Sequence, residues 1–495
     1  MHDSWRGGRS VALIALMGVA LLWSGASRGG TLVETQLFAG NTEQAIQTAA
    51  LAAEAAPQDL DAQELYIDLL LSSGLGSMAE RAYNERVSVD PTNPDVHYLV
   101  GRAARSGAAA AKAYEKALRL NPDHARSHMG MAAVHMAAGA HPDAAHAYFR
   151  AINLDPNLAE AWLGLIRADL AMGLGAEALE LAKKGIKYVP QEPGLYLVVA
   201  EMVPADAIRV LSGAVDRGVD DPRVSAALAA SLLIEGDADA ALVTARHALA
   251  TDRTDVEATR VALFAAAITS GTLDNAGYQR LIEARDVQES DPVAALARFD
   301  KLVSDYPGCA LTWLGRSQVK RQLKDTEGAV EDSGKAANLA PGNIEVEASH
   351  GLLLLDMGLF VDAARFLRVA SEGRPWDASL GLGFAAALTG SHKPEDAARV
   401  LAVLNDLHPY DARTTIQYGQ ALVDSGQAEE AYQLVRGALK RVPDPRLAVA
   451  MVMTATAAKH YAEAADILEQ LAAQTGRETL AQEARRLREL EAAGG

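Results

Sequence analysis

The sequence predicts an all-α protein, a right-handed superhelical solenoid of stacked antiparallel helix pairs with a repeat of about 34 residues. Three observations predict this fold. Prolines recur at a constant interval over much of the chain, an alanine stands at one fixed distance before each of these prolines, and a glycine stands at another fixed distance before several of them. A period of this length, sustained along a chain, is typical of proteins in which each repeat stacks on its neighbours.

The periodic prolines and alanines mark successive repeats. The prolines are Pro57, Pro91, Pro122, Pro156, Pro190, Pro307, Pro341, Pro375, Pro409 and Pro443. The alanines are Ala45, Ala79, Ala110, Ala144, Ala178, Ala295, Ala329, Ala363, Ala397 and Ala431. Proline ends a helix, and short side chains let two helices approach closely. Each repeat is therefore expected to be a helical hairpin that its proline closes.

The segment from Ala412 to Pro443 illustrates one repeat. Apolar residues recur at helical spacing from Ala412, and Gly426 is expected to end this first helix because glycine adopts a positive φ at little cost. A second helix that carries Ala431 is expected to run to Pro443. Two helices of this length cannot bury their own apolar faces, so the core must form between stacked repeats.

The repeat resembles the tetratricopeptide repeat family, whose pattern is Trp-x2-Leu-Gly-x2-Tyr followed by Ala, an aromatic residue, Ala and Pro. The segments that carry the match include Trp162 with Leu165, Trp313, Ala110-x3-Tyr114-x2-Ala117-x4-Pro122 and Ala144-x3-Tyr148-x2-Ala151-x4-Pro156. The resemblance extends over about residues 31–477. It implies the solenoid fold and a role in binding other proteins, although this fold supports many functions.

Two departures from the period suggest how the chain is divided. In the first, Pro204 is expected to end a helix after Met202. In the second, the interval from Arg253 to Pro307 is longer than one repeat, and the additional segment includes a helix expected over 273–288. Asp291 and Pro292 then provide an N-cap and a first-turn proline for the helix that carries Ala295.

The predicted organisation therefore has five parts. They are 1–30, a signal peptide or N-terminal membrane anchor; 31–253, a block of about seven repeats; 254–307, an expanded repeat with an extra helix; 308–477, a block of about five repeats; and 478–495, a capping helix and tail. The expanded repeat is a possible hinge. The alternative is ordinary sequence drift within one rigid superhelix.

The N-terminus predicts a location outside the cytoplasm. Arg6 and Arg9 precede an apolar run over 11–23, which is followed by the small residues of 24–26. This is the pattern of a secretory signal with cleavage after Ala26, and the run is short for a membrane span, which needs about 20 apolar residues. We expect a periplasmic protein, soluble after cleavage or anchored to the inner membrane. A buried first helix is the remaining alternative.

Composition and motifs limit the chemistry. The net charge of −18 argues against binding to nucleic acid. The single cysteine, Cys309, cannot form an intrachain disulfide and is expected to be a small buried residue at a helix start. His124 and His128 are four residues apart and could face one metal ion, but three or more properly placed ligands would be needed, and His128 is more simply packed between helices. No nucleophile, base and orienting group occur together, so neither catalysis nor a cofactor or metal is expected.

The concave face of the solenoid is the predicted binding surface for other proteins. The residues placed there by register are Met129, Ala133, Met136, Leu163, Arg167, Gln318, Arg321, Ile416 and Gln420. The paired Lys and Asn residues with which the family's best-known groove binds a C-terminal carboxylate are absent at the matching positions. The predicted function is a protein–protein interaction scaffold in the cell envelope. The alternative is the periplasmic component of a machine for polysaccharide export or cytochrome assembly.

Overall fold

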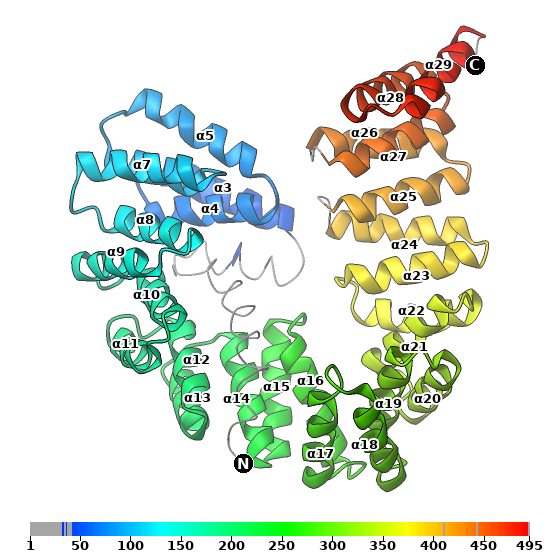
Figure 1. The fold of residues 1–495 in the computed structure, drawn as a ribbon, viewed down its shortest axis with the longest axis horizontal. Helices are drawn as coiled ribbons and strands as arrows, with labels where there is room; N and C mark the ends of the chain where they lie inside the picture. The colour runs from blue at the N-terminus through cyan, green and yellow to red at the C-terminus, as the bar shows by residue number, and fades with distance from the viewer. Residues whose placement is uncertain (1–31, 34–35, 37–41, 409–410, 442–443, 494–495) are drawn as a thin grey trace. The chain divides into compact units, whose positions relative to one another are not determined.

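The computed structural model describes residues 32–33, 36, 42–408, 411–441 and 444–493. Every regular element in these ranges is a helix, which confirms the all-α fold. The chain divides into two compact units, Met1–Ala265 (unit 1) and Ala266–Gly495 (unit 2), each built from consecutive helices (Figure 1). The predicted N-terminal segment 1–30, with its apolar run 11–23, lies outside the described residues.

Unit 1 contains five complete helix pairs and a degenerate one among the elements that the structure describes. Its helices are α3 (Thr42–Ala55), α4 (Leu60–Ser72), α5 (Gly76–Val89), α6 (Pro94–Ala103), α7 (Gly107–Leu120), α8 (Ala125–Ala137), α9 (His141–Leu154), α10 (Ala159–Ala171), α11 (Gly175–Tyr188), α12 (Pro193–Met202), η2 (Pro204–Asp206), α13 (Ala207–Asp216), α14 (Pro222–Glu235) and α15 (Ala238–Thr251). The boundary between the units falls within α16 (Val256–Thr269).

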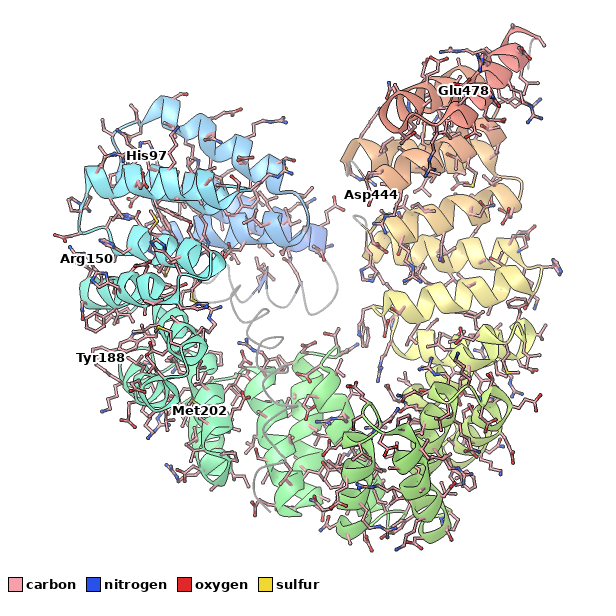
Figure 2. All side chains as sticks on the ribbon, viewed as in Figure 1. His97, Arg150, Tyr188, Met202, Asp444 and Glu478 are labelled. Carbon is pink, nitrogen blue, oxygen red and sulfur yellow. The ribbon has the colours of Figure 1, made fainter. Side chains whose placement is uncertain are left out.

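Unit 2 continues the same arrangement. Its helices are α17 (Asn275–Asp286), α18 (Pro292–Asp305), α19 (Ala310–Gln322), α20 (Thr326–Leu339), α21 (Ile344–Asp356), α22 (Phe360–Gly373), α23 (Ala378–Gly390), α24 (Pro394–Leu407), α25 (Ala412–Asp424), α26 (Ala428–Arg441), α27 (Pro445–Ala457), α28 (Tyr461–Thr475) and α29 (Glu478–Ala492). The last described helix, α29, begins at Glu478, which is labelled in Figure 2.

The first helices of successive repeats lie closer to one another than the second helices do. In unit 1, α4 packs on α6, α6 on α8, α8 on α10 and α12 on α14. In unit 2, α19 packs on α21, α21 on α23, α23 on α25 and α25 on α27. These helices are the first members of their pairs, so they line the inner, concave side of each unit.

The periodic residues occupy the positions expected of them. All ten periodic alanines are buried between helices. Gly74, Gly139, Gly173, Gly358 and Gly426 have φ angles of 72° to 83°, which confirms their role at helix ends. The equivalent turns also place Lys324, His392 and Lys459 at φ angles of 58° to 65°. A positive φ is uncommon for such residues, so the packing of the hairpin imposes this turn even where glycine is absent.

Stacking between hairpins uses an aromatic ring against a glycine. Tyr148 on α9 packs on Gly164 of α10, and Phe299 on α18 packs on Gly315 of α19. A Cβ atom at either glycine would lie within 3.0 Å of the ring, a distance that Cβ atoms essentially never adopt. The ring and the glycine have the same separation in sequence in both pairs, so the period of the sequence brings them together in successive hairpins.

A side-chain hydrogen bond to the carbonyl oxygen of the periodic proline ties several of the turns to the helix that follows. Trp162 Nε1 donates to Pro156 O at 2.8 Å, and Trp313 Nε1 donates to Pro307 O at 2.9 Å. His97, labelled in Figure 2, places Nε2 2.8 Å from the carbonyl oxygen of Pro91. The residue types differ, but each carries a polar atom that reaches the carbonyl six residues earlier.

The structure confirms the helix ends predicted in the two regions that depart from the period. The helix α12 ends at Met202 and is followed by η2, which confirms the effect of Pro204. Asp291 accepts a hydrogen bond from Ala294 N at 2.9 Å and Pro292 begins α18, which confirms that start. The helix α17 lies within residues 273–288 and packs against α18. The predicted block boundaries and the hinge within 254–307 stay predictions.

Candidate protein-binding faces

Three positions on each first helix face the inner side. They are the second, fifth and ninth residues after the helix N-cap, here called the inner-face positions. In α25, which follows the N-cap Asp411, these residues are Arg413, Ile416 and Gln420. Residues spaced by three or four lie on one side of a helix, so these positions form a continuous stripe from repeat to repeat.

The structure places all nine predicted binding residues on first helices, namely α8, α10, α19 and α25. Their exposure differs widely. Met129 is only 4% exposed and lies in the core of unit 1, against which Met136 and Leu163 also pack. Ile416 packs partly against the core of unit 2.

The polar members of the set are more accessible, and Ala133 is exposed as well. Arg321 and Gln420 are exposed and Gln318 is half-buried. Arg167 is also half-buried and donates from Nε to Leu163 O, within its own helix, at 3.3 Å. Gln420 Nε2 donates to Asp424 Oδ1 at 2.7 Å. The role of these nine residues in binding a partner stays a prediction.

A network of charged side chains covers the start of the inner face of unit 1. Here it is called the clasp, and its members are Asp61, Glu64 and Asp68 on α4, Tyr98 and Arg102 on α6, Arg126 on α8 and Glu160 on α10. All seven occupy inner-face positions. The network therefore joins side chains from four successive repeats.

Arg102 is the centre of the clasp. Its guanidinium donates to both carboxylate oxygens of Asp68, at 3.1 and 2.7 Å, and to both carboxylate oxygens of Glu160, at 2.9 and 2.8 Å. Arg126 donates to Glu64 and to Asp61, and Tyr98 Oη donates to Glu64 Oε1 at 2.7 Å. The side chains of Arg102, Asp68 and Glu160 are only 19, 11 and 13% exposed.

Burial governs the electrostatics of this network. Desolvation raises the pKa of Glu64 and of Asp68, although the arginines beside them act in the opposite direction. Burial alone would lower the pKa of Arg102, but Glu160 and Asp68 outweigh it, so the pKa is raised and Arg102 stays charged. The clasp thus holds its ions in place against an appreciable desolvation penalty.

The clasp was not predicted from the sequence, although the sequence contains a signal for it. Asp68 and Arg102 are 34 residues apart, as are Glu64 and Tyr98. One repeat length separates residues at the same position of neighbouring first helices. Opposite charges at this interval therefore indicate an ion pair across the inner face.

The inner face of unit 2 has a different character. At the same positions α21 to α27 present the apolar side chains Leu352, Ala386, Ile416, Val449 and Met453, together with the charged Glu345, Arg413 and Arg446. Leu352 is 38% exposed and Val449 60% exposed. The helix that carries Val449 begins after Asp444, which is labelled in Figure 2. The apolar members of this stripe are only partly used in the core.

The ion pairs of unit 2 lie within one hairpin or join two adjacent hairpins. Arg316 Nε and Lys320 Nζ, both on α19, lie 2.7 and 2.9 Å from Asp332 of α20, which is completely buried. Between α19 and α27, no ion pair among the described residues joins first helices of different repeats. Nothing comparable to the clasp therefore crosses this face.

The candidate metal ligands have other partners. His124 caps α8, with Nε2 2.8 Å from Asp95 Oδ1 and Nδ1 2.7 Å from Ser127 Oγ. His128 Nε2 lies 2.9 Å from Pro122 O. Within the part of the chain that the structure describes, no three His, Cys, Asp or Glu side chains are grouped to hold a metal ion. Cys309 is buried at the N-cap of α19, as predicted.

None of the helices in the described ranges combines the length and the apolar character that crossing a bilayer requires. The apolar run 11–23, for which a membrane anchor was one expectation, lies outside these ranges.

Comparison with known families matches the repeats in both units. One sequence model of the tetratricopeptide repeat matches residues 295–444, and a second model of this repeat matches residues 102–159. No curated protein matches the chain.

Three of the matching solved structures differ in how much of this chain they cover. YrrB, described as a TPR protein with an unusual peptide-binding site, is 16% identical, with 38% of this chain and 97% of that chain covered and a TM-score of 0.34. The Cut9–Hcn1 hetero-tetramer of the APC/C is 13% identical, with 97% and 99% covered and a TM-score of 0.32. A thermophilic TPR protein of Thermus thermophilus is 23% identical, with 34% and 95% covered and a TM-score of 0.29.

Proposed function

The chain belongs to the tetratricopeptide-repeat family, and from this premise we propose that it is a protein–protein interaction scaffold whose partners bind on the inner face of unit 2. A solenoid of this kind presents an extended concave surface and few other sites for a ligand. The observation that carries the proposal is the exposed apolar stripe at the inner-face positions of α21 to α27. Val449 is 60% exposed there and Leu352 is 38% exposed.

The chemistry of this stripe defines the kind of partner segment that it fits. Leu352, Ile416, Val449 and Met453 offer apolar contact, and methionine adapts to partners of different shape. Gln420 and the exposed Arg413 lie beside them and can fix the orientation of a bound segment through hydrogen bonds. We expect a helical or extended segment with apolar side chains along one side.

Substitution on the stripe tests the proposal. Val449→Asp places a charge on the inner face of α27, and Val403→Asp is the matched control on α24, a second helix, where Val403 is 56% exposed. The tagged full-length chain would be crosslinked in cells, and its partners quantified by mass spectrometry. We expect Val449→Asp to lower partner recovery at least tenfold and Val403→Asp to leave it unchanged. Equal recovery with both variants would contradict the proposal.

We further propose that the scaffold works in the cell envelope. The support is the N-terminal sequence, in which Arg6 and Arg9 precede the apolar run 11–23 and small residues follow it. A product that begins at Ser27 in the soluble envelope fraction is the expected result. An intact N-terminus in the membrane fraction, recovered with export or assembly proteins, would support the alternative role in a polysaccharide-export or cytochrome-assembly machine. Recovery of the intact chain from the cytosol would contradict both.

A further inference from the structure

The clasp connects repeats that are not neighbours. Arg126 on α8 reaches Asp61 and Glu64 on α4, and Arg102 on α6 reaches Glu160 on α10. In each case one first helix lies between the two that are joined. In a solenoid each repeat normally contacts only the repeats beside it, so these bonds add a connection that stacking alone does not supply.

The bonds also form a continuous chain through all four helices. Asp68 joins α4 to α6 through Arg102, and the same guanidinium continues to Glu160 on α10. Glu64 accepts from both Tyr98 on α6 and Arg126 on α8. Because a guanidinium is a planar fork that binds two carboxylates in fixed directions, the network sets the spacing of the helices as well as their contact.

The energetics favour a geometric role over a stabilising one. Glu64 and Asp68 are 8% and 7% exposed, so their charges are held almost without water. Buried ion pairs of this kind add little net stability compared with apolar residues of similar size, whereas loss of one partner is strongly destabilising. A network that is maintained under these conditions is suited to specifying one arrangement of the helices.

We propose that the clasp makes α4, α6, α8 and α10 open and close as one cooperative block, while the repeats of unit 2 open individually. Bonds between α4 and α8 and between α6 and α10 mean that no one of these repeats can open without breaking an ion pair to a repeat two positions away. The clasp side chains fill all the inner-face positions of α4 and most of those of α6, so this part of unit 1 is a brace of defined curvature whose inner face is largely occupied at these two helices.

Native-state hydrogen exchange on the full-length chain tests the proposal. In the unmodified protein, the slowest amides of the four helices should share one opening free energy and one dependence on denaturant. Arg102→Lys keeps the positive charge but cannot bind both carboxylates in the same way. We expect exchange in α4 and α10 to differ by at least tenfold in this variant. Four different opening free energies in the unmodified protein would overturn the proposal.

A matched control and a second variant separate coupling from stability. Arg374→Lys is the control, because Arg374 pairs with Glu345 in unit 2 and is 20% exposed, close to the 19% of Arg102. It should leave exchange in α4 to α10 unchanged. The triple variant Asp68→Leu, Arg102→Met, Glu160→Leu should keep its thermal midpoint while α10 no longer exchanges together with α4. Exchange that stays in step in this variant would show that packing carries the coupling, which overturns the proposal.

Discussion

The inner faces of unit 1 and unit 2 share one backbone register and differ in what that register presents. In α4 of unit 1 the second, fifth and ninth residues after the N-cap are Asp61, Glu64 and Asp68. In α27 of unit 2 the same positions carry Arg446, Val449 and Met453. The first set is bound to arginines of other repeats, and the second set leaves apolar side chains exposed.

The difference teaches that repeat geometry and repeat function are set by separate groups of residues. The alanines between helices, the glycines at turns and the ring-on-glycine contacts recur in both units and build the stack. Inner-face residues that take no part in these contacts, such as Asp68 and Val449, can either tie repeats together or remain available to a partner. In unit 2 the buried charge of Asp332 is neutralised within its own hairpin, which leaves the inner stripe uncovered.

Removal of one carboxylate from the clasp should have the largest effect on stability. Glu160→Ala leaves one side of the buried Arg102 guanidinium without a partner, and we expect unit 1 to lose about 3–5 kcal/mol of unfolding free energy. The equivalent position of α21 is Glu345, whose side chain is 42% exposed and pairs with Arg374. Glu345→Ala should reduce the stability of unit 2 by under about 1 kcal/mol. Urea unfolding, followed by amide exchange in α4–α10 and α19–α27 separately, measures both.

Similar losses from the two substitutions would remove the contrast between the faces. A small effect of Glu160→Ala would mean that water replaces the carboxylate. A large effect of Glu345→Ala would mean that the inner face of unit 2 is also held together by ion pairs.

Glu192 in unit 1 and His350 in unit 2 should contribute to stability with opposite pH dependence. Burial raises the pKa of Glu192, the N-cap of α12 in unit 1, from 4.5 to about 7. The folded state therefore keeps a proton that the unfolded state loses, so unit 1 should lose stability as pH rises from 4.5 to 7, by up to about 3 kcal/mol. Glu192→Gln keeps the hydrogen bond from Gly194 N and should remove this slope.

In unit 2 the group with the opposite effect is His350. It is buried, and its Nδ1 lies 2.7 Å from Ser333 Oγ. Burial lowers the pKa of His350 below 6.5, and nearby Arg365 acts in the same direction. The unfolded state takes up a proton first, so unit 2 should lose stability as pH falls through 6.5. Thermal unfolding between pH 5 and about 8 checks both signs. A pH profile of unit 1 that Glu192→Gln leaves unchanged would contradict the assignment.

Glycine substitution should have a smaller effect, and the same one in both units. Gly164→Ala and Gly315→Ala each force a methyl group against an aromatic ring, Tyr148 in unit 1 and Phe299 in unit 2. Overpacking of this kind costs about 1–3 kcal/mol. Gly437→Ala is the control, because a Cβ atom there meets only the end of a flexible arginine. Calorimetric unfolding that shows unequal losses for the two glycines would indicate that the units do not stack in the same way.

The sequence predicts a feature correctly wherever a residue acts on its immediate surroundings. Gly426 ends a helix, Asp291 and Pro292 begin one, and Pro204 causes an early stop, as predicted. Each of these effects depends on the φ angle or on the hydrogen bonds of residues within one turn. The turns at Lys324, His392 and Lys459 were not anticipated, because there the hairpin, and not the residue type, imposes the positive φ.

The candidate site was predicted less completely. The register placed the nine binding residues on first helices, but it did not distinguish the buried Met129 from the exposed Gln420. It also placed no binding role on Val449, which has the most exposed apolar side chain of the inner-face positions considered in unit 2. Exposure depends on how closely the neighbouring repeat approaches, and this distance is not encoded in any single repeat.

The sequence by itself determined the repeat, the helical hairpins and the core positions, because these follow from local backbone preferences that recur with each repeat. Only the tertiary structure decided which side chains meet across the stack. Arg102 and Glu160 are 58 residues apart, and Arg126 and Asp61 are 65 apart. Their meeting depends on the small rotation added at each repeat, which accumulates over several repeats and is set by packing along the whole unit.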